Sequence, residues 1–333
     1  KHLAFLLISI LSAIFVLYFP NLDKLKPLNP YLVYLAIIFL GLVLMMGTTV
    51  KGGTRQLGIG FISFQPSFFA RLALVFFFAS YLDKKHEELL KADVKSFLSD
   101  FAPIIMLTAV IFILIILEKH LSTLIISGLT LLGVLTYAGL RYRLIGLILL
   151  VGLLGGIIIL TQGDDYRSKR LEIYKKYSLF LRSDKDIKIE ADDYQVKESL
   201  TALSSGGLLG TGIARGRAKH YYLPEARTDY IYTVIGEEFG FLGAFVVFAL
   251  HCLLFFRAFR VANRQENRYL QFLCAGVAMN IFFNTLVNVG VSISILPPTG
   301  NTLPFVSYGG SALLFDSIGV GVILNISAKR RYV

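Results

Sequence analysis

Apolar runs long enough to cross a membrane alternate with polar segments along almost the whole chain. The chain has 333 residues, and about 17 to 25 consecutive apolar residues suffice for one spanning helix. Nine stretches meet this pattern: 3–19, 31–48, 67–82, 101–117, 121–139, 143–161, 229–256, 269–293 and 309–328. The pattern therefore predicts an all-α polytopic membrane protein with nine transmembrane helices, built as a single membrane domain over residues 1–333.

Two segments depart from this alternation. Residues 162–228 form one long polar stretch, charged at first and then glycine-rich over Ser204–Gly212; loops of this length without a function are uncommon. Residues 294–311 contain three prolines and three glycines, too many for a continuous helix. Non-helical backbone at membrane depth persists only where it is buried in protein or lines a wet cavity. We therefore expect 294–311 to be a broken helix that lines a cavity.

The positions of the basic residues predict the orientation. If the nine helices alternate, the loops richest in lysine and arginine all fall on one side, together with the basic C-terminal residues Lys329, Arg330 and Arg331. That side is cytoplasmic by the positive-inside rule. The rule places the C-terminus inside and the long 162–228 loop outside. The N-terminus, Lys1-His2, would then be external and would run straight into lipid, so we expect one more helix to precede it.

Composition agrees with a membrane protein and argues against nucleic acid as a partner. Hydrophobic residues make up 55% of the chain and charged residues 17%, below the roughly 25% of soluble domains. The net charge of +11 is spread over alternating loops instead of one patch, which favours contact with anionic membrane lipid. Cys252 and Cys274 both lie in apolar runs, so no disulfide framework is predicted.

Asp229 is the strongest candidate for chemistry. It lies in the run Leu223–Tyr230, where the long loop meets a predicted span, and a carboxylate at the edge of hydrocarbon is costly enough to indicate function. Two other external segments are expected to converge with it. One runs from Lys51 through Arg55 to Gln65-Pro66-Ser67 and Arg71, and the other is Leu296–Ser311.

Several motifs, in the right order along the chain, resemble the SEDS family, the RodA/FtsW peptidoglycan polymerases, over essentially the whole chain. They are the Asp229 stretch with Gly236-Glu237-Glu238, the pair Tyr194-Gln195, the run Ser205-Gly206-Gly207, and Pro297–Ser311. The family has ten membrane helices, and its second aligns best with residues 3–19, in agreement with a missing first helix. Leu223-Pro224-Glu225-Ala226 is slightly closer to FtsW than to RodA, which leaves a division or an elongation role open.

The resemblance implies a polymerase of lipid II, the undecaprenyl-pyrophosphate-linked disaccharide peptide, at the outer face of the bacterial cytoplasmic membrane. A sugar 4-hydroxyl would attack an anomeric carbon, the lipid pyrophosphate would leave, and the configuration would invert. Asp229 matches the family's required aspartate, and Arg55 and Arg71 are candidates for phosphate contacts. The resemblance also implies a class B penicillin-binding transpeptidase as partner and no organic cofactor. Further candidates for substrate contacts are Gln195, Ser205, Gly206, Glu225, Arg227, Glu238, Pro297, Thr299 and Ser307.

Two roles for Asp229 stay open. A helix N-terminus and Arg227 stabilise a negative charge there, which suits a ligand for Mg²⁺ or Mn²⁺, whereas partial burial suits a general base. Arg55 and Arg71 could instead be cations that reach from the bilayer to the interface. Glu237 and Glu238 could pair with loop arginines, and the glycines of 205–212 favour backbone hinges over a phosphate cradle.

The chain departs from the family pattern at three places. Phe68 stands where the family's Gln-Pro-Ser motif continues with glutamate, Arg71 stands for a lysine, and Lys119-His120-Leu121-Ser122-Thr123 replaces Pro-Asp-Leu-Gly-Thr. These losses cast doubt on any scheme that needs a second acidic residue in the cavity.

Two other functions compete with a polymerase. A lipid II transporter without chemistry would need paired broken helices, and the sequence predicts one break. A non-enzymatic scaffold for cell-wall synthesis would leave Arg55, Asp229 and Ser307 without a purpose.

Overall fold

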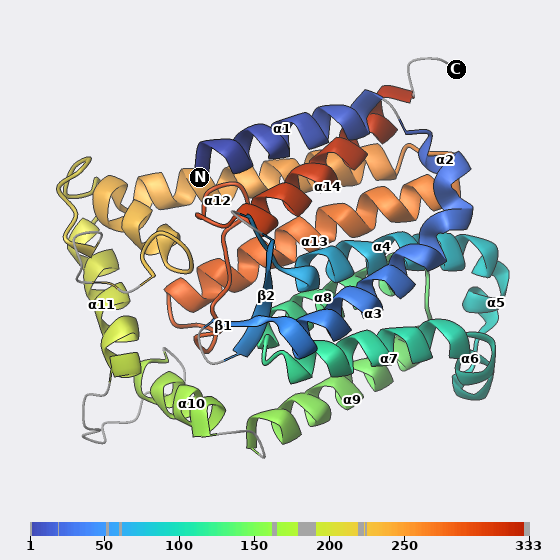
Figure 1. The fold of residues 1–333 in the computed structure, drawn as a ribbon, viewed down its shortest axis with the longest axis horizontal. Helices are drawn as coiled ribbons and strands as arrows, with labels where there is room; N and C mark the ends of the chain where they lie inside the picture. The colour runs from blue at the N-terminus through green and yellow to red at the C-terminus, as the bar shows by residue number, and fades with distance from the viewer. Residues whose placement is uncertain are drawn as a thin grey trace. The chain divides into compact units, whose positions relative to one another are not determined.

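A computed structural model describes residues 2–18, 20–50, 53–59, 62–161, 165–178, 191–218, 223 and 225–329. The described chain is mostly helical, and its helices follow one another in the order of Figure 1. They are α1 (His2–Tyr18), α2 (Leu22–Leu25), the 3-10 helix η1 (Lys26–Leu28), α3 (Asn29–Met46), α4 (Pro66–Lys84), α5 (His86–Lys91), α6 (Val94–Asp100), α7 (Ala102–Leu117), α8 (Leu121–Tyr137), α9 (Tyr142–Thr161), α10 (Asp165–Tyr177), α11 (Ala191–Gly206), α12 (Ile231–Ala262), α13 (Arg268–Ser292) and α14 (Gly310–Lys329).

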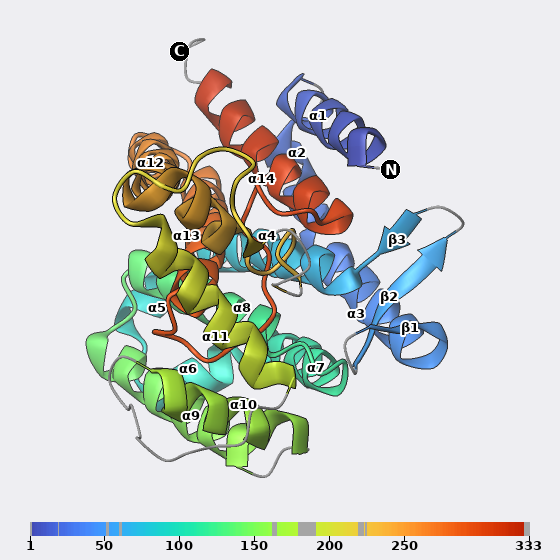
Figure 2. The same ribbon diagram turned by 90° about the vertical axis from the view of Figure 1, so that its left-hand side faces the viewer.

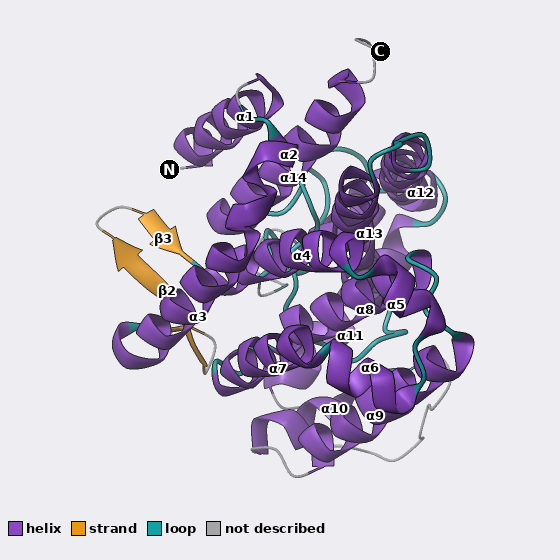
Figure 3. Cartoon of the chain, turned by 90° about the vertical axis from the view of Figure 1, so that its right-hand side faces the viewer, coloured by secondary structure: helices purple, strands orange, loops and turns teal. Residues whose placement is uncertain are grey.

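A small sheet between α3 and α4 corrects the all-α expectation. Strands β1 (Thr48–Val50), β2 (Gly53–Ile59) and β3 (Ile62–Phe64) pair antiparallel in the order β1-β2-β3, and they are the orange arrows of Figure 3. The segment is too short for another span, and its β-branched residues favour an extended backbone. Strand pairing satisfies the backbone polar groups that a loop beside the membrane would leave open.

The membrane-spanning character is clear, while the number of spans stays a prediction. Among the described residues, five helices are long and apolar enough to cross a membrane, and a sixth span results if the bent pair α6–α7 is counted as one. Three shorter apolar helices coincide with other expected stretches: Leu3–Tyr18, Leu121–Tyr137 and Tyr142–Ile158. The chain is therefore a multi-pass helical membrane protein, in which nine expected stretches are helical.

The chain divides into two compact units. The first contains residues 1–149, 254–283 and 309–333, and the second contains residues 150–253 and 284–308. Helices α9, α12 and α13 each contribute residues to both units.

Helix α4 is the centre of the first unit. It contacts α3, α7, α8 and α14, and Figure 2 shows these helices around it. Most of its side chains are buried, including Leu74, Phe77 and Leu82. A helix that is apolar all round and buried on most faces belongs to the interior of a bundle.

Helix α1 packs along α14 in the same unit, as Figure 1 shows. A Cβ on Gly321 would lie 2.7 Å from the backbone oxygen of Ala13, so the absence of a side chain permits the close approach. The side-chain amide of Asn325 donates to the carbonyls of Val16, Leu17 and Pro20, at 2.9 to 3.1 Å. These bonds satisfy carbonyls that the end of α1 leaves open.

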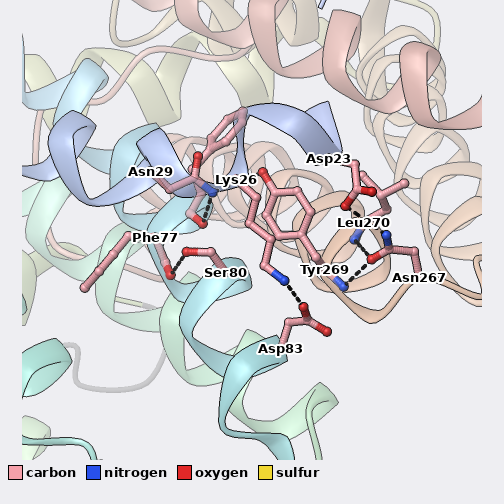
Figure 4. A network of polar contacts seen from close by, with 10 residues as sticks. Asp23, Lys26, Asn29, Phe77, Ser80, Asp83, Asn267, Tyr269 and Leu270 are labelled. Atoms are coloured by element: carbon pink, nitrogen blue, oxygen red, sulfur yellow. Dashed lines mark hydrogen bonds and ion pairs between the residues drawn. The ribbon is translucent and has the colours of Figure 1, made fainter. Parts of the chain in front are cut away.

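A polar network ties α2, η1 and α3 to α4 and α13 at one end of this unit (Figure 4). Lys26 forms an ion pair with Asp83. The amide of Asn29 donates to the Phe76 carbonyl and to the Tyr269 hydroxyl, each at 3.1 Å. Lys26 is one of the basic residues expected on the cytoplasmic side, and here its charge also joins two helices.

Helix α12 is interrupted near its start, in the second unit. Gly240 has φ 67° and ψ −169°, which no helical residue adopts. The interruption was not predicted from the apolar run 229–256, because glycine occurs in spanning helices without breaking them. The glycine-rich segment that follows α11 lies against this interruption.

Backbone hydrogen bonds between the two segments compensate for the lost helical bonds. Thr211 N–H donates to the Glu237 carbonyl at 2.9 Å, and Phe241 N–H donates to the Gly207 carbonyl at 2.8 Å. A Cβ on Gly210 would lie 2.2 Å from the Glu238 oxygen. The glycines are therefore needed for a close approach of two backbones, in agreement with a backbone role for this run.

Candidate active site

Asp229 lies in a tight turn immediately before α12. The carbonyl of Glu225 accepts the backbone N–H of Thr228, Asp229 and Tyr230, at 3.1 to 3.3 Å. Glu225 itself has φ 55°, and its carboxylate accepts the Thr228 hydroxyl at 2.6 Å. Asp229 is 7% exposed. The turn thus holds a largely buried carboxylate at the entrance of a helix.

Asn288 of α13 links the Asp229 turn to the segment between α13 and α14. Its side-chain amide donates to the backbone carbonyl of Asp229 at 2.9 Å and to that of Asn301 at 2.5 Å. The amide of Asn301 donates in turn to the Asn284 carbonyl at 3.0 Å. All of these groups are buried, so these bonds hold both segments against α13.

Sequence reasoning missed this asparagine. Asn280, Asn284, Asn288 and Ser292 recur every four residues in a mostly apolar helix, which places them on one face. Polar side chains repeated on one face of a spanning helix usually face a protein interior. That spacing was the available signal.

Gly300 brings the linking segment directly against the Asp229 carboxylate. An ideal Cβ on Gly300 would lie 3.2 Å from Asp229 Oδ2, and Gly300 has φ 66°. Both the close approach and the left-handed backbone favour glycine over any residue with a side chain. The Asp229 side chain therefore points toward the backbone at Gly300.

Ser307 and Tyr308 attach the far end of the same segment to the Asp229 turn. The Ser307 hydroxyl donates to the Thr228 carbonyl at 2.5 Å and accepts the Leu303 N–H at 2.7 Å. The Tyr308 N–H donates to the Arg227 carbonyl at 2.9 Å. Of the residues predicted to contact substrate, Ser307 thus has a structural role in shaping the loop.

The remaining candidates of the second unit occupy varied positions. The Ser205 hydroxyl donates to the Ala202 carbonyl at 2.8 Å, and a Cβ on Gly206 would lie 2.0 Å from the Gly236 oxygen. Glu225 and Arg227 have exposed side chains in the Asp229 turn. Gln195 and Pro297 are half-buried, and Glu238 and Thr299 are buried.

The Glu237 side chain holds a loop by accepting hydrogen bonds from the loop's backbone. Its carboxylate accepts the N–H of Arg217 at 2.7 Å and the N–H of Ala218 at 3.0 Å. Pairing with loop arginines was one interpretation of this residue. Both hydrogen bonds come from backbone amides, so Glu237 helps to hold the loop next to the α12 interruption.

Arg55 and His120 belong to a buried polar cluster of the first unit. The Arg55 guanidinium donates to the Lys119 carbonyl at 2.6 Å, at the C-terminal end of α7, where a cation is favourable. His120 Nδ1 lies 3.1 Å from Gln65 Nε2, 3.0 Å from Ser67 Oγ and 2.9 Å from Thr123 Oγ1. His120 therefore sits within a hydrogen-bonded core.

Glu118 lies beside this cluster, in the short connection between α7 and α8. It is 0% exposed, and within the part of the chain that the structure describes neither carboxyl oxygen has a hydrogen-bond partner. Burial raises the pKa of Glu118 to about 8, against the opposing effect of the nearby Arg55 charge. The side chain is therefore mostly protonated at neutral pH.

Arg71 of α4 pairs with Asp316 of α14. Nη2 lies 3.5 Å from Asp316 Oδ1, and both side chains are almost fully buried. The guanidinium also lies over the Phe68 ring, 5.3 Å from its centroid. Sequence reasoning noted that a cavity glutamate was replaced by Phe68 but did not identify Asp316 as an acidic partner of Arg71. Arg71 and Arg55 lie in the first unit and Asp229 lies in the second, so their convergence stays a prediction.

A protein-only metal cage is not present in the described segments. They hold no group of three or more histidine, cysteine, aspartate or glutamate side chains that could bind a metal ion. Mg²⁺ commonly binds proteins through one or two carboxylates together with substrate phosphates, and a single carboxylate such as Asp229 suits that mode.

Comparison with known proteins gives a consistent result. A family model described as cell cycle protein, covering FtsW, RodA and SpoVE, matches residues 1–332. The probable peptidoglycan glycosyltransferase FtsW of Haemophilus influenzae is 36% identical over 301 residues, which cover 89% of this chain and 72% of the relative. Stage V sporulation protein E of Bacillus subtilis is 32% identical over 336 residues, covering 100% of this chain and 87% of the relative.

A solved structure shares the fold. It comes from a study of how a peptidoglycan synthase complex coordinates polymerization and crosslinking. Its chain superposes with a TM-score of 0.78 at 24% identity and covers 100% of this chain and 90% of that one.

Proposed function

The chain belongs to the FtsW/RodA/SpoVE family, and from that membership we propose that it polymerises lipid II with Asp229 as its catalytic carboxylate. The general activity, peptidoglycan glycosyltransferase, follows from the family and agrees with the multi-pass helical fold. The observation that carries the proposal for Asp229 is the bonding around it. Asp229 is 7% exposed, its backbone is held by the turn and by Asn288, and its carboxylate lies against the backbone at Gly300.

The reaction assigned to this site is an inverting sugar transfer. The 4-hydroxyl oxygen of one lipid-linked sugar attacks the anomeric carbon of another, and the bond from that carbon to the pyrophosphate oxygen breaks. The hydroxyl proton passes to the Asp229 carboxylate, and the lipid pyrophosphate leaves with its negative charge. Such a reaction needs one positioned base and a positive group near the leaving phosphate. Arg55 and Arg71 are the proposed cations. To contact the phosphates, Arg55 would add to or exchange its bond to the Lys119 carbonyl, and Arg71 its ion pair with Asp316.

We propose Asp229 as the base, with a ligand role as the alternative outcome. Among the described residues no group of three or more acidic, histidine or cysteine side chains surrounds Asp229, and in the ligand alternative Mg²⁺ or Mn²⁺ is bound together with substrate phosphate. The base role and the ligand role are separated by measuring polymerisation after a chelator has removed divalent ions, and again as each ion is added back. Full activity in chelator supports the base, whereas recovery that saturates with added ion supports the ligand.

The proposal extends to location and partner. The chain would lie in the bacterial cytoplasmic membrane with its C-terminus inside, so that Asp229 meets lipid II at the outer face. A class B penicillin-binding transpeptidase would crosslink the strands that it makes. Support for a partner comes from the resemblance, and the similar fold occurs in a peptidoglycan synthase complex.

The test is polymerisation of fluorescent lipid II by the purified protein with its transpeptidase. Asp229→Asn keeps the shape of the side chain and removes its charge, so we expect activity to fall by roughly 10² to 10⁴-fold. Glu172→Gln, at an exposed position of α10, removes one carboxylate elsewhere and should leave activity unchanged.

Three outcomes are distinguishable. Equal polymer from wild type and Asp229→Asn would remove Asp229 from catalysis. Absence of polymer together with movement of lipid II across liposome membranes would favour a transporter. Absence of both would favour a scaffold.

A further inference from the structure

Two side chains of α10 hold the segment that follows α13. Arg170 Nη1 donates to the Pro298 carbonyl at 2.9 Å, and the Tyr174 hydroxyl donates to the Ile295 carbonyl at 2.8 Å. Arg170 and Tyr174 are four residues apart, so they share one face of the helix. All four residues belong to the second unit.

These carbonyls depend on donors from outside their own segment. Helix α13 ends at Ser292, and Ser294, two residues later, has φ 56°. The N–H groups of Ile295 and Leu296 both return to the Gly290 carbonyl. Pro297 and Pro298 have no N–H, so the backbone here cannot form a helical or ladder pattern. Pro298 is half-buried and Ile295 is exposed. A carbonyl that is partly shielded from water is costly without a partner, and α10 supplies a donor to each of the two carbonyls.

The segment held by α10 continues to Gly300, which lies against the Asp229 side chain. Pro298 is two residues before Gly300, whose Cβ position lies 3.2 Å from Asp229 Oδ2. The next residue, Asn301, shares the amide of Asn288 with the Asp229 carbonyl. A shift of the backbone at Pro298 would therefore be transmitted within two residues to the surface against which the carboxylate lies.

Helix α10 is itself bonded to α11. Lys176 pairs with Asp193 of α11 at 2.7 Å, and Asp193 is almost fully buried. Lys176 Nζ donates to the Asp193 carboxylate, and this hydrogen bond raises the pKa of Lys176 above its ordinary value. Ser199 of α11 lies 2.7 Å from the Thr233 hydroxyl and donates to the Ser292 carbonyl at 3.2 Å. Bonds thus run from α10 through α11 to both α12 and α13.

We propose that Arg170 and Tyr174 are positioning residues, which hold residues 295–300 so that the Asp229 carboxylate has its productive orientation. The inference rests on the proposed function of Asp229. Neither side chain is assigned a contact with substrate. Their effect is on geometry, and a misplacement of about 1 Å in an active site can cost on the order of 10²-fold in rate.

The test is steady-state polymerisation by the full chain with its transpeptidase, using Arg170→Ala, Tyr174→Phe and the double variant. Tyr174→Phe removes only the hydroxyl, and Arg170→Lys retains a donor and the charge. We expect kcat to fall roughly 10-fold for each single variant and up to about 100-fold for the double, with KM within about twofold of wild type. Arg170→Lys should recover part of the loss.

Lys175→Ala is the matched control. Lys175 is an exposed cation on the same helix, so its removal takes away the same charge without a bond to the segment. A similar loss of kcat in Lys175→Ala and Arg170→Ala would show that charge on α10 matters and would overturn the positioning role. A rise in KM alone would also overturn it, because it would indicate substrate binding.

A second measurement is independent of activity. Hydrogen exchange at the amides of Thr299, Gly300 and Asn301 should become faster in the double variant, while the thermal unfolding temperature stays near that of wild type. Unchanged exchange at these amides would overturn the inference, even if activity fell.

Asp229→Asn, measured in the same assay, separates the two proposals. If Asp229→Asn is as active as wild type, the proposed function fails. If it is inactive while Arg170→Ala and Tyr174→Phe match wild type in rate and exchange, the positioning role alone fails.

Discussion

At the scale of single residues, the molecule places charged groups in two different environments. Asp229 is held at the start of a helix, with its backbone bonded on both sides. Arg71 and Asp316 are instead paired in the interior of the first unit. Two charges removed from water stabilise each other only while both are present. Such a pair keeps a cation inside a helix bundle.

Removal of one member of this pair should be strongly destabilising. Asp316→Ala leaves a buried guanidinium without its counter-ion, and we expect the free energy of unfolding to fall by roughly 3–5 kcal/mol. The double variant Arg71→Met, Asp316→Leu replaces the pair with apolar side chains and should recover most of the loss. Denaturant unfolding in detergent, monitored by circular dichroism, gives both values. If the double variant is no more stable than Asp316→Ala, the pair is not the cause.

Glu118 should make stability depend on pH. Its pKa is raised to about 8 in the folded protein, from an ordinary value of 4.5, so the folded state holds a proton that the unfolded state has released. The stabilisation is complete below about pH 4.5 and is lost as pH rises to about 8, by at most about 1.4 kcal/mol per pH unit.

Glu118→Gln cannot titrate and should lack this dependence. Unfolding temperatures measured from pH 5 to pH 9 should therefore fall more steeply for wild type than for Glu118→Gln. Glu172→Gln, at an exposed position, should follow wild type. Parallel curves for wild type and Glu118→Gln would contradict the raised pKa.

At the scale of elements, the interruption of α12 is the feature that most affects the candidate site. Gly240 leaves the helix geometry, and the glycine-rich segment after α11 supplies the missing backbone partners. The same region holds Glu237, whose carboxylate binds the amides of the 217–218 loop. An interrupted helix with external backbone partners can carry non-helical structure at membrane depth without exposing polar groups to lipid.

A side chain at Gly210 should disrupt this arrangement. Gly210 has φ 86°, and a Cβ there would lie 2.2 Å from the Glu238 oxygen. We expect Gly210→Ala to lower the free energy of unfolding by roughly 1–3 kcal/mol, because both the backbone conformation and the contact are unfavourable. Gly146→Ala in α9, with nothing within 4 Å of its Cβ position, is the control and should keep or slightly raise stability, because alanine is favoured over glycine in a helix. Equal thermal unfolding of both variants would argue against a close backbone approach at Gly210.

At the scale of the whole molecule, the functional prediction depends on which side of the membrane each unit's loops occupy. The positive-inside pattern places the segment with α10 outside and the connection with α6 inside. The proposed chemistry requires the first of these, because lipid II is polymerised at the outer face.

Cysteine labelling checks this orientation. In a background with Cys252 and Cys274 replaced by alanine, a membrane-impermeant maleimide applied to spheroplasts should label Glu172→Cys and leave Lys95→Cys unlabelled. Both positions are exposed, so both should react once the membrane is permeabilised. The reverse pattern would place Asp229 on the wrong side and contradict the proposed reaction.

The sequence by itself determined the features that depend on local pattern. Apolar run length predicted where helices form, and each of the nine expected stretches is mostly helical where the structure describes it. The motif order around Asp229 and Pro297–Ser311 predicted the family, which the family match confirms. Run length and motifs are local properties, because both depend on consecutive residues. The length of an apolar run is set by the thickness of the membrane that it crosses.

Only the tertiary structure decided which distant residues meet. Asn288 next to Asp229, Asp316 next to Arg71, and the donors of α10 on the Ile295 and Pro298 carbonyls each join positions far apart in the chain. The strands β1–β3 and the interruption at Gly240 likewise depend on partners elsewhere in the chain or across a turn. Backbone groups and buried charges must be satisfied by whatever lies beside them in the fold, and sequence neighbours do not reveal those partners.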